Sequence, residues 1–302
     1  MIVVAGEALI DLIISPDGRL VAVPGGGPFN TARTIARLGL PVAFLGRLSD
    51  DRFGQNLRAV LSDDGVDLSL IESTSAPTTL AIAELDDVGA ATYRFHMAET
   101  SAPGLSADAV RAALAIGPRA LHVGALGLVL EPMAQAIVDG VKRADPTTLV
   151  MLDPNCRPLV IADRPGCLER VQPVLRRADI VKLSSDDLSY MAPGVSTVAA
   201  ARDLLGHGPA AVLLTDGPKP VVGLTPTFTF ELAVPDVAVV DTVGAGDAFG
   251  GAFLARWIER GFGRAELADD VALREAVARA IEVATLTCGR PGADPPRAGD
   301  LP

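Results

Sequence analysis

Near its C-terminal end the chain reads Val239-Val240-Asp241-Thr242-Val243-Gly244-Ala245-Gly246-Asp247-Ala248-Phe249. Two β-branched residues lead into a glycine-rich turn, and an apolar helical pattern begins directly after it. Gly244 and Gly246 leave backbone N–H groups uncovered at the N-terminus of that helix. These groups and the helix dipole attract negative charge, so the stretch predicts an anion site.

Asp247 lies at the mouth of this predicted anion site, where a carboxylate is electrostatically unfavourable without a further role. A carboxylate there can accept a hydroxyl proton while the N–H groups stabilise a transferring phosphoryl group. The residues alone leave open that Asp247 only caps the helix. Two other phosphate loops are excluded. None of the three lysines follows a glycine, as a P-loop requires, and Phe249 stands where the dinucleotide fingerprint needs its third glycine.

A second glycine-rich segment, Gly25-Gly26-Gly27-Pro28-Phe29-Asn30, lies near the start of the chain. Glycines there provide either a hinge or close approach of the backbone to a ligand. Asn30 then presents a short donor and acceptor side chain from the first turn of the next helix. Taken alone, the segment is better explained as a glycine turn followed by an asparagine cap.

Short apolar runs alternate with helical patterns along most of the chain, which predicts a mostly parallel sheet with helices on both faces, an α/β fold. Ligands in such sheets bind beyond the carboxyl ends of the strands. The predicted strands are Ile2–Val4, Val42–Leu45, Ala120–Val123, Thr148–Leu152, Ile180–Leu183 and Ala211–Leu214. The predicted helices are Asn30–Leu38, Gly54–Asp63, Ala107–Ala115, Glu131–Ala144, Gly166–Arg177, Val198–Leu205, Gly246–Arg260 and Leu273–Thr285.

Two segments, Asp11–Pro24 and Thr78–His96, break this alternation and read like amphipathic antiparallel strands. The second contains a turn signal at Asp86–Gly89. We expect both insertions to form one small sheet that covers a site as a lid, on a single domain spanning residues 1–302. The alternative is an extra hairpin at the edge of the main sheet.

Composition limits the classes of function. Of the 302 residues 49% are hydrophobic and 21% charged, which suits a large buried core. A formal net charge of −11 disfavours nucleic acid and membrane surfaces as partners.

Glu7 and Asp11 interrupt the apolar N-terminus, so neither a signal peptide nor a membrane span is expected. Three cysteines without a C-x-x-C pair fit a reducing compartment, and we expect a cytoplasmic protein.

The two glycine-rich segments together resemble the two signatures of the ribokinase/PfkB family of carbohydrate kinases. The resemblance runs from about residue 2 to 296 and is strongest at the second signature. Intermediate stretches match in order: Gly6-Glu7-x-x-x-Asp11, Gly46–Gly54, Asp153-Pro154-Asn155-x-Arg157, Lys182-x-Ser184-x-x-Asp187 and Thr215-Asp216-Gly217. The Asp153–Arg157 stretch is similar to that of fructokinase-like members.

The resemblance implies roles in catalysis and sugar binding. Gly244, Ala245 and Gly246 form the anion hole, and Asp247 is the catalytic base. The sugar is held by Asp11, Gly26, Gly27, Asn30, Glu131, Asn155 and Arg157, with Asp247 against the reacting hydroxyl. Asp11 alone reads equally as a solvated strand end. Glu131 is equally explained as an acid that stabilises the first turn of a helix. Arg157 is equally explained as a structural residue.

The resemblance also implies a site for ATP with Mg²⁺. Its residues are Lys182, Ser184, Asp187, Thr215 and Gly217, together with Gly244 and Gly246. Asp187 would act near the water shell of Mg²⁺, an ion that usually keeps several waters. Asp241 and Thr242 lie where relatives bind a monovalent cation such as K⁺, or they only form a turn. Ser184 and Asp187 are shorter than the usual Asn and Glu, and Pro220 removes one backbone donor from the nucleotide loop.

The expected activity is ATP-dependent phosphorylation of a terminal hydroxyl of a small sugar, with fructose favoured. Arg94 could instead meet a carboxylate, as in a 2-keto-3-deoxygluconate kinase, and nucleoside kinases share the second signature. An inactive sugar or nucleotide sensor on the same fold stays open, whereas an NAD-linked oxidoreductase is disfavoured by the missing fingerprint. Relatives often dimerise through their lids, and the alternating lid strands here would permit a homodimer.

Overall fold

The structure, a computed structural model, describes residues 1–86 and 91–301. A nine-stranded sheet has the order β13-β12-β11-β10-β9-β8-β1-β4-β5. All neighbours from β5 to β11 are parallel, while β12 and β13 are added antiparallel at one edge. The strands are β1 (Ile2–Ala5), β4 (Val42–Ser49), β5 (Ile71–Thr74), β8 (Ala120–Gly124), β9 (Leu149–Asp153), β10 (Ile180–Ser184), β11 (Ala211–Thr215), β12 (Val221–Leu224) and β13 (Thr229–Leu232). The mostly parallel fold predicted from the sequence is confirmed.

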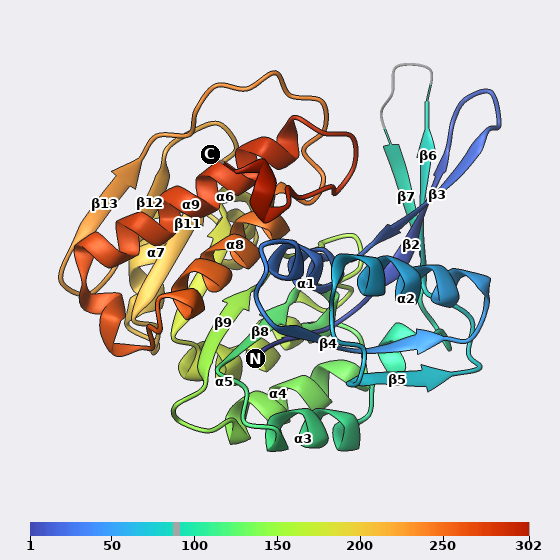
Figure 1. The fold of residues 1–302 in the computed structure, drawn as a ribbon, viewed down its shortest axis with the longest axis horizontal. Coiled ribbons are helices and arrows are strands. Elements are labelled where there is room, and N and C mark those ends of the chain that lie inside the picture. Colours follow the sequence, from blue (N-terminus) through green and yellow to red (C-terminus); the bar gives the residue numbers. More distant parts are fainter. Residues whose placement is uncertain (87–90, 302) are drawn as a thin grey trace.

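Helices cover both faces of this sheet (Figure 1). One face carries α1 (Gly27–Arg37), α2 (Arg52–Asp64), α8 (Ala245–Glu259) and α9 (Asp270–Cys288). The other carries α3 (Ala107–Ala115), α4 (Met133–Arg143), α5 (Arg164–Arg177), α6 (Ser185–Met191) and α7 (Thr197–Leu205). Successive residues of a strand point to opposite faces, so in β1 Val4 packs into the first core and Val3 into the second.

The predicted elements are all present, with boundaries displaced by up to four residues. Among the strands and α-helices of the described residues, four short ones were missed: β5, β12, β13 and α6. Strand β5 reads IEST and helix α6 reads SDDLSYM, so neither has the apolar run that reveals a buried element. Tertiary pairing at the sheet edges and a Ser184–Asp187 capping box stabilise them instead.

The two inserted segments form a separate four-stranded sheet in the order β3-β2-β6-β7 (Figure 1). Its strands are β2 (Leu9–Ile14), β3 (Leu20–Gly25), β6 (Leu80–Leu85) and β7 (Ala91–His96). Each insertion is an antiparallel hairpin, and the two hairpins join through the parallel pair β2 and β6. The single small sheet is therefore confirmed and the edge-hairpin alternative is wrong. The turn predicted at Asp86–Gly89 lies, after Asp86, outside the described residues.

Within the described ranges, no helix is long and apolar enough to cross a membrane.

Candidate active site

The predicted anion site forms at the start of α8. Gly244 is the N-cap residue, and its φ of 77° is a left-handed conformation that favours glycine. No side chain caps the helix. Ala245 N donates to Thr242 O at 3.3 Å, so the binding capacity lies with the other N–H groups of the first turn and with the helix dipole. A Cβ on Gly244 would lie 2.6 Å from the Cβ of Ala293, so the C-terminal segment packs directly against the turn.

Asp247 is buried in the first turn of α8, with 9% of its surface exposed. Its carboxylate accepts a hydrogen bond from Asn30 Nδ2 at 2.9 Å and caps no helix N–H, so the reading of Asp247 as only a cap is wrong. Burial raises the pKa of Asp247 to about 7, and the Asn30 hydrogen bond opposes this rise. A carboxylate with a pKa near neutrality is well matched to a general base.

A buried ion pair lies beside the anion site. Lys182 Nζ is 2.8 Å from Asp153 Oδ2, and both side chains are almost fully buried, Lys182 within β10 and Asp153 at the end of β9. A Cβ on Gly246 would lie 2.9 Å from Lys182 Nζ, so the ammonium group adjoins the turn. Lys182 was predicted as a nucleotide contact. Asp153 was missed as a site residue, although its place directly after a buried strand marks the ligand edge of the sheet.

Gly27, Asn30 and Asn155 meet at Asp247. A Cβ on Gly27 would lie 3.1 Å from Asn155 Nδ2 and 3.3 Å from Asp247 Oδ1, so only glycine leaves this space open. Asn155 has a φ of 40°, an unusual conformation that persists where the surroundings enforce it. The structure thus brings together residues from the first signature, the loop after β9 and the second signature.

Arg157 is exposed, and its positive charge lowers the pKa values of Asp11, Asp153 and Asp247. It therefore faces the same acidic centre. Burial raises the pKa of Asp11, at the start of the lid, to about 6. Asp11 is thus a partly buried acid near the site rather than a freely solvated strand end.

The predicted nucleotide residues follow β10 and β11, two adjacent parallel strands in which Ser184 pairs with Thr215. Asp187 is occupied within the protein: its Oδ2 accepts from Ser184, and its Oδ1 accepts from Cys156 N at 2.6 Å. Gly217 follows with a φ of 55° and open space around its Cα.

Several predicted site residues have partners other than the central acids. Glu131 pairs with Arg170 at 3.0 Å, and Arg94 pairs with Glu84 at 3.5 Å, both from largely exposed positions. Asp241 accepts hydrogen bonds from Val243 N and Gly292 N. It therefore ties the turn to the C-terminal segment, while Thr242 follows it in the same turn.

Glu7 is a further buried acid that the sequence did not assign to the site. It is 2% exposed, accepts hydrogen bonds from Gly27 N at 3.2 Å and Gly127 N at 3.0 Å, and is electrostatically coupled to Asp247. Its sequence signals are its place in the family-like stretch Gly6-Glu7-x-x-x-Asp11 and its charge between the apolar runs of β1 and β2.

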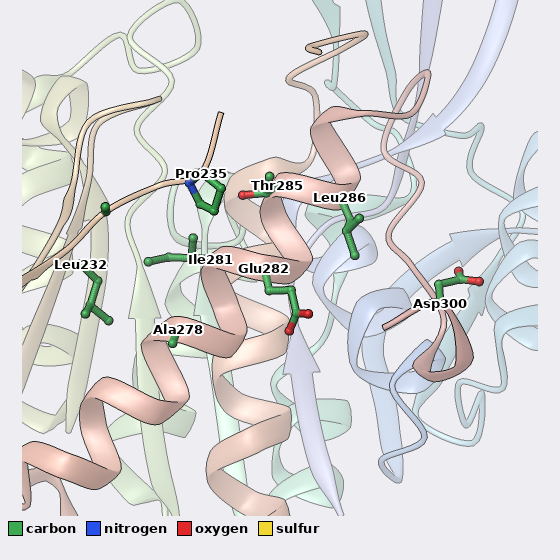
Figure 2. Close-up of a pocket in the computed structure, with 9 residues that line it drawn as sticks. Leu232, Pro235, Ala278, Ile281, Glu282, Thr285, Leu286 and Asp300 are labelled. Atoms are coloured by element: carbon green, nitrogen blue, oxygen red, sulfur yellow. The ribbon is translucent and has the colours of Figure 1, made fainter. Parts of the chain in front are cut away.

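A cavity of about 420 Å³ lies between α9 and the segment after β13 (Figure 2). Leu232, Pro235, Ile281 and Leu286 give it an apolar lining. Thr285 also lines it, and its buried hydroxyl has no hydrogen-bond partner among the described residues. The chain that lines the cavity at Pro235 continues to the Gly244 turn. An apolar cavity with an unsatisfied polar atom, on a segment leading to an anion site, suits a flat heteroaromatic group.

Comparison with known proteins agrees with this geometry. The model of the pfkB family of carbohydrate kinases matches residues 1–298. A fructokinase from Rhizobium leguminosarum bv. trifolii is 35% identical over 260 residues, covering 84% of this chain and 79% of that protein. The structure of a fructokinase with bound ATP from Xylella fastidiosa superposes with a TM-score of 0.89 at 29% identity, covering 100% of this chain and 94% of the other. An aminoimidazole riboside kinase from Salmonella enterica, complexed with aminoimidazole riboside and an ATP analogue, gives 0.83 at 26% identity, covering 97% and 94%.

Proposed function

The chain belongs to the pfkB family of carbohydrate kinases, an ATP-dependent group, and on that premise we propose that it phosphorylates a terminal hydroxyl of fructose. The observation that carries the proposal is the buried Asp247 carboxylate beside an uncapped helix N-terminus. The named fructokinase relatives support fructose as the acceptor.

The proposed reaction begins with the sugar held under the lid by Asp11, Asn30 and Asn155. Asn30 donates to Asp247, while its buried Oδ1 has no partner among the described residues and is available to a sugar hydroxyl. Asp247 takes the proton of the CH₂OH group as that oxygen attacks the γ-phosphorus of ATP, and the bond from the γ-phosphorus to the β,γ-bridging oxygen breaks, which leaves the phosphorylated sugar and ADP. The N–H groups of Gly244 and Gly246 and the nearby Lys182 ammonium would stabilise the charge on the transferring phosphoryl group. The Ala245 N–H, also expected in the anion hole, instead donates to Thr242 O in this structure.

For ATP we propose that the triphosphate lies along the ends of β10 and β11, past Thr215 and Gly217, toward the Gly244 turn. The base would occupy the cavity beside Thr285, whose hydroxyl is available for a ring nitrogen. Pro220 lacks an N–H, so the loop after β11 has one donor fewer for phosphate.

Mg²⁺ would arrive with the nucleotide and neutralise phosphate charge. No group of three or more metal-ligating side chains occurs among the described residues, so the protein itself offers no closed site. Asp153 Oδ1 is buried without a partner and fits the water shell of such an ion. Asp187 already accepts several hydrogen bonds and would act only through water. Asp241, whose carboxylate meets two backbone N–H groups, would with Thr242 border a K⁺ site.

A panel of acceptors tests the substrate. Fructose, ribose, 2-keto-3-deoxygluconate and adenosine are compared in an ATP-consumption assay with Mg²⁺ and K⁺. The highest kcat/KM is expected for fructose, and a tenfold preference for another acceptor would contradict the proposal. The exposed Arg94–Glu84 pair gives no support to a carboxylate-bearing acceptor. Tight sugar binding without turnover would instead indicate a sensor.

We further propose a homodimer formed through the lids in the cytoplasm. Leu20, Val21 and Tyr93 on the lid strands are exposed apolar side chains that pairing would cover. The three cysteines are free, as expected in a reducing compartment. Sedimentation should give a dimer for the parent protein and a monomer for Leu20→Glu.

A further inference from the structure

Glu7 lies where the chain first crosses from the main sheet to the lid. The outgoing crossing runs from β1 through Gly6 and Glu7 to β2, and the return crossing runs from β3 through Gly26 into α1. The two crossings touch, because a Cβ on Gly26 would lie 2.8 Å from the carbonyl oxygen of Glu7. Gly26, with a φ of 114°, has a conformation and a space that only glycine satisfies.

The Glu7 side chain fastens three segments at this point. Oε1 accepts from Gly27 N on the return crossing, and Oε2 accepts from Gly127 N on the loop after β8. A buried carboxylate is costly unless hydrogen bonds compensate it, so these two bonds fix the relative position of the segments. Polar hinge contacts of this kind are retained at a cost in stability.

The peptide that Glu7 holds is part of the floor of the active site. Gly27 borders the space next to Asp247, Asn155 and Ala125, since a Cβ on Gly27 would lie 3.3 Å from Asp247 Oδ1, 3.1 Å from Asn155 Nδ2 and 3.4 Å from the Ala125 Cβ. Ala125 and Asn155 both have left-handed backbones, with φ of 50° and 40°. Residues in such conformations persist only where the surrounding structure holds them in place. At the two crossings, Glu7 provides such support through its hydrogen bond to Gly27 N.

We infer that Glu7 is a positioning residue that couples the first lid hinge to the catalytic centre, so that closure of the lid over the sugar brings Gly27, Asn30 and Asp247 into their reactive arrangement. Glu7 does not touch the reacting atoms in this role. Loss of Glu7 should therefore admit water to the active site, and this effect should be larger than any loss of ATP binding.

The variant Glu7→Gln tests this inference. A glutamine side chain has the same size but only one acceptor oxygen, so either Gly27 N or Gly127 N loses its partner. We expect the ratio of sugar-independent ATP hydrolysis to sugar phosphorylation to rise about tenfold, the factor expected for one ordinary buried hydrogen bond. KM for the sugar should rise several-fold, while KM for ATP stays within about twofold of the parent value.

Glu266→Gln is the matched control. Glu266 also accepts a glycine N–H, from Gly263 at 2.8 Å, but it lies in the turn Ala265–Ala268 away from the lid crossings. This variant should keep the hydrolysis ratio of the parent. An unchanged ratio in folded Glu7→Gln, or an equal rise in the control, would overturn the inference.

Glu7→Asp, measured in parallel, keeps the carboxyl group but is too short to reach both N–H groups, and it should show the same rise. Failure of both Glu7 variants to fold would mark Glu7 as a residue of folding and would overturn its role in the hinge. The inference rests on the proposed kinase activity. If the parent phosphorylates no acceptor, the proposed function fails and the role of Glu7 needs a separate test. Amide hydrogen exchange at Gly27 provides it, and this exchange should be faster in Glu7→Gln than in the parent.

Discussion

At the scale of single residues, the proposed chemistry depends on one carboxylate held in a protein interior. Asp247 is buried, yet it has a donor at Asn30 and a cation at Lys182 nearby. Burial and the Asp153 charge raise its pKa, whereas Asn30, Lys182 and Arg157 lower it. With a pKa of about 7, the carboxyl group is about half ionised at neutral pH, and its ionised form is basic enough for the proposed removal of a hydroxyl proton.

Asp247→Asn should lower kcat about 10²–10⁴-fold, the usual contribution of a positioned general base. The amide keeps the shape of the side chain but cannot take a proton. Steady-state kinetics with the preferred sugar measures the effect, and KM for ATP serves as the internal control. A variant rate within a factor of three of the parent would remove Asp247 from this role.

The pH dependence should report the same group. Because Asp247 must be ionised, kcat/KM should fall as pH drops through its pKa of about 7. Asn30→Ala removes a hydrogen bond to the charged form of Asp247. The pH at which kcat/KM falls to half its maximum should therefore rise by about one unit. Asp153, Lys182 and Arg157 are the other charged groups coupled to Asp247. Glu7 is coupled to Asp247 as well, and burial raises the pKa of Glu7 to about 8, so Glu7→Gln is measured alongside to separate the two titrations. If the acid side of the kcat/KM profile is unchanged in Asn30→Ala, a group other than Asp247 limits the rate.

At the scale of elements, a charge cluster fastens the C-terminal segment behind the anion site. Asp64 at the end of α2 pairs with Arg33 at 2.8 Å, Arg37 at 2.7 Å and Arg297 at 2.9 Å. Arg33 also donates to Ala293 O, next to Gly244. The cluster thus joins α1 and α2 to the segment on which the turn packs.

Asp64→Asn should lower the free energy of unfolding by about 3–5 kcal/mol, because it leaves buried arginine charge without its partner. Urea denaturation measures this change. Asp63→Asn is the control, since Asp63 is exposed on the same helix and the same substitution there should cost less than about 0.5 kcal/mol. Equal effects at the two positions would show that Asp64 is not a structural anchor.

At the scale of the whole molecule, the active site reduces stability at the pH where it works. The native pKa of Asp247, about 7, is above its ordinary value of 3.8. Between these values the native state binds a proton that the unfolded state has lost, so this group's contribution to stability falls as pH rises from about 4 to about 7.

Asp247→Asn should therefore be more stable than the parent at pH 8, by about 2–4 kcal/mol, and nearly equal to it at pH 4. Thermal and urea unfolding at both pH values would test this, with the exposed Asp63→Asn as a variant that should follow the parent. A difference that is the same at pH 4 and pH 8 would contradict the burial of an ionised carboxylate.

The sequence predicted the parts of this protein that depend on neighbours a few residues apart. The Gly244–Asp247 turn, the alternation of strands and helices and the two lid hairpins arise from local backbone preferences and from periodic burial. The elements β5, β12 and α6 were not predicted because their local sequence patterns are weak. Pairing at the sheet edge stabilises the two strands, and capping stabilises the helix.

Only the tertiary structure decided which distant residues act on Asp247. Asn30 is 217 positions away, the Lys182–Asp153 pair comes from two strand ends, and Glu7 reaches Gly27 and Gly127 across the lid crossings. A pKa near 7 follows from burial and from charges brought close by packing, and no local pattern encodes either of these.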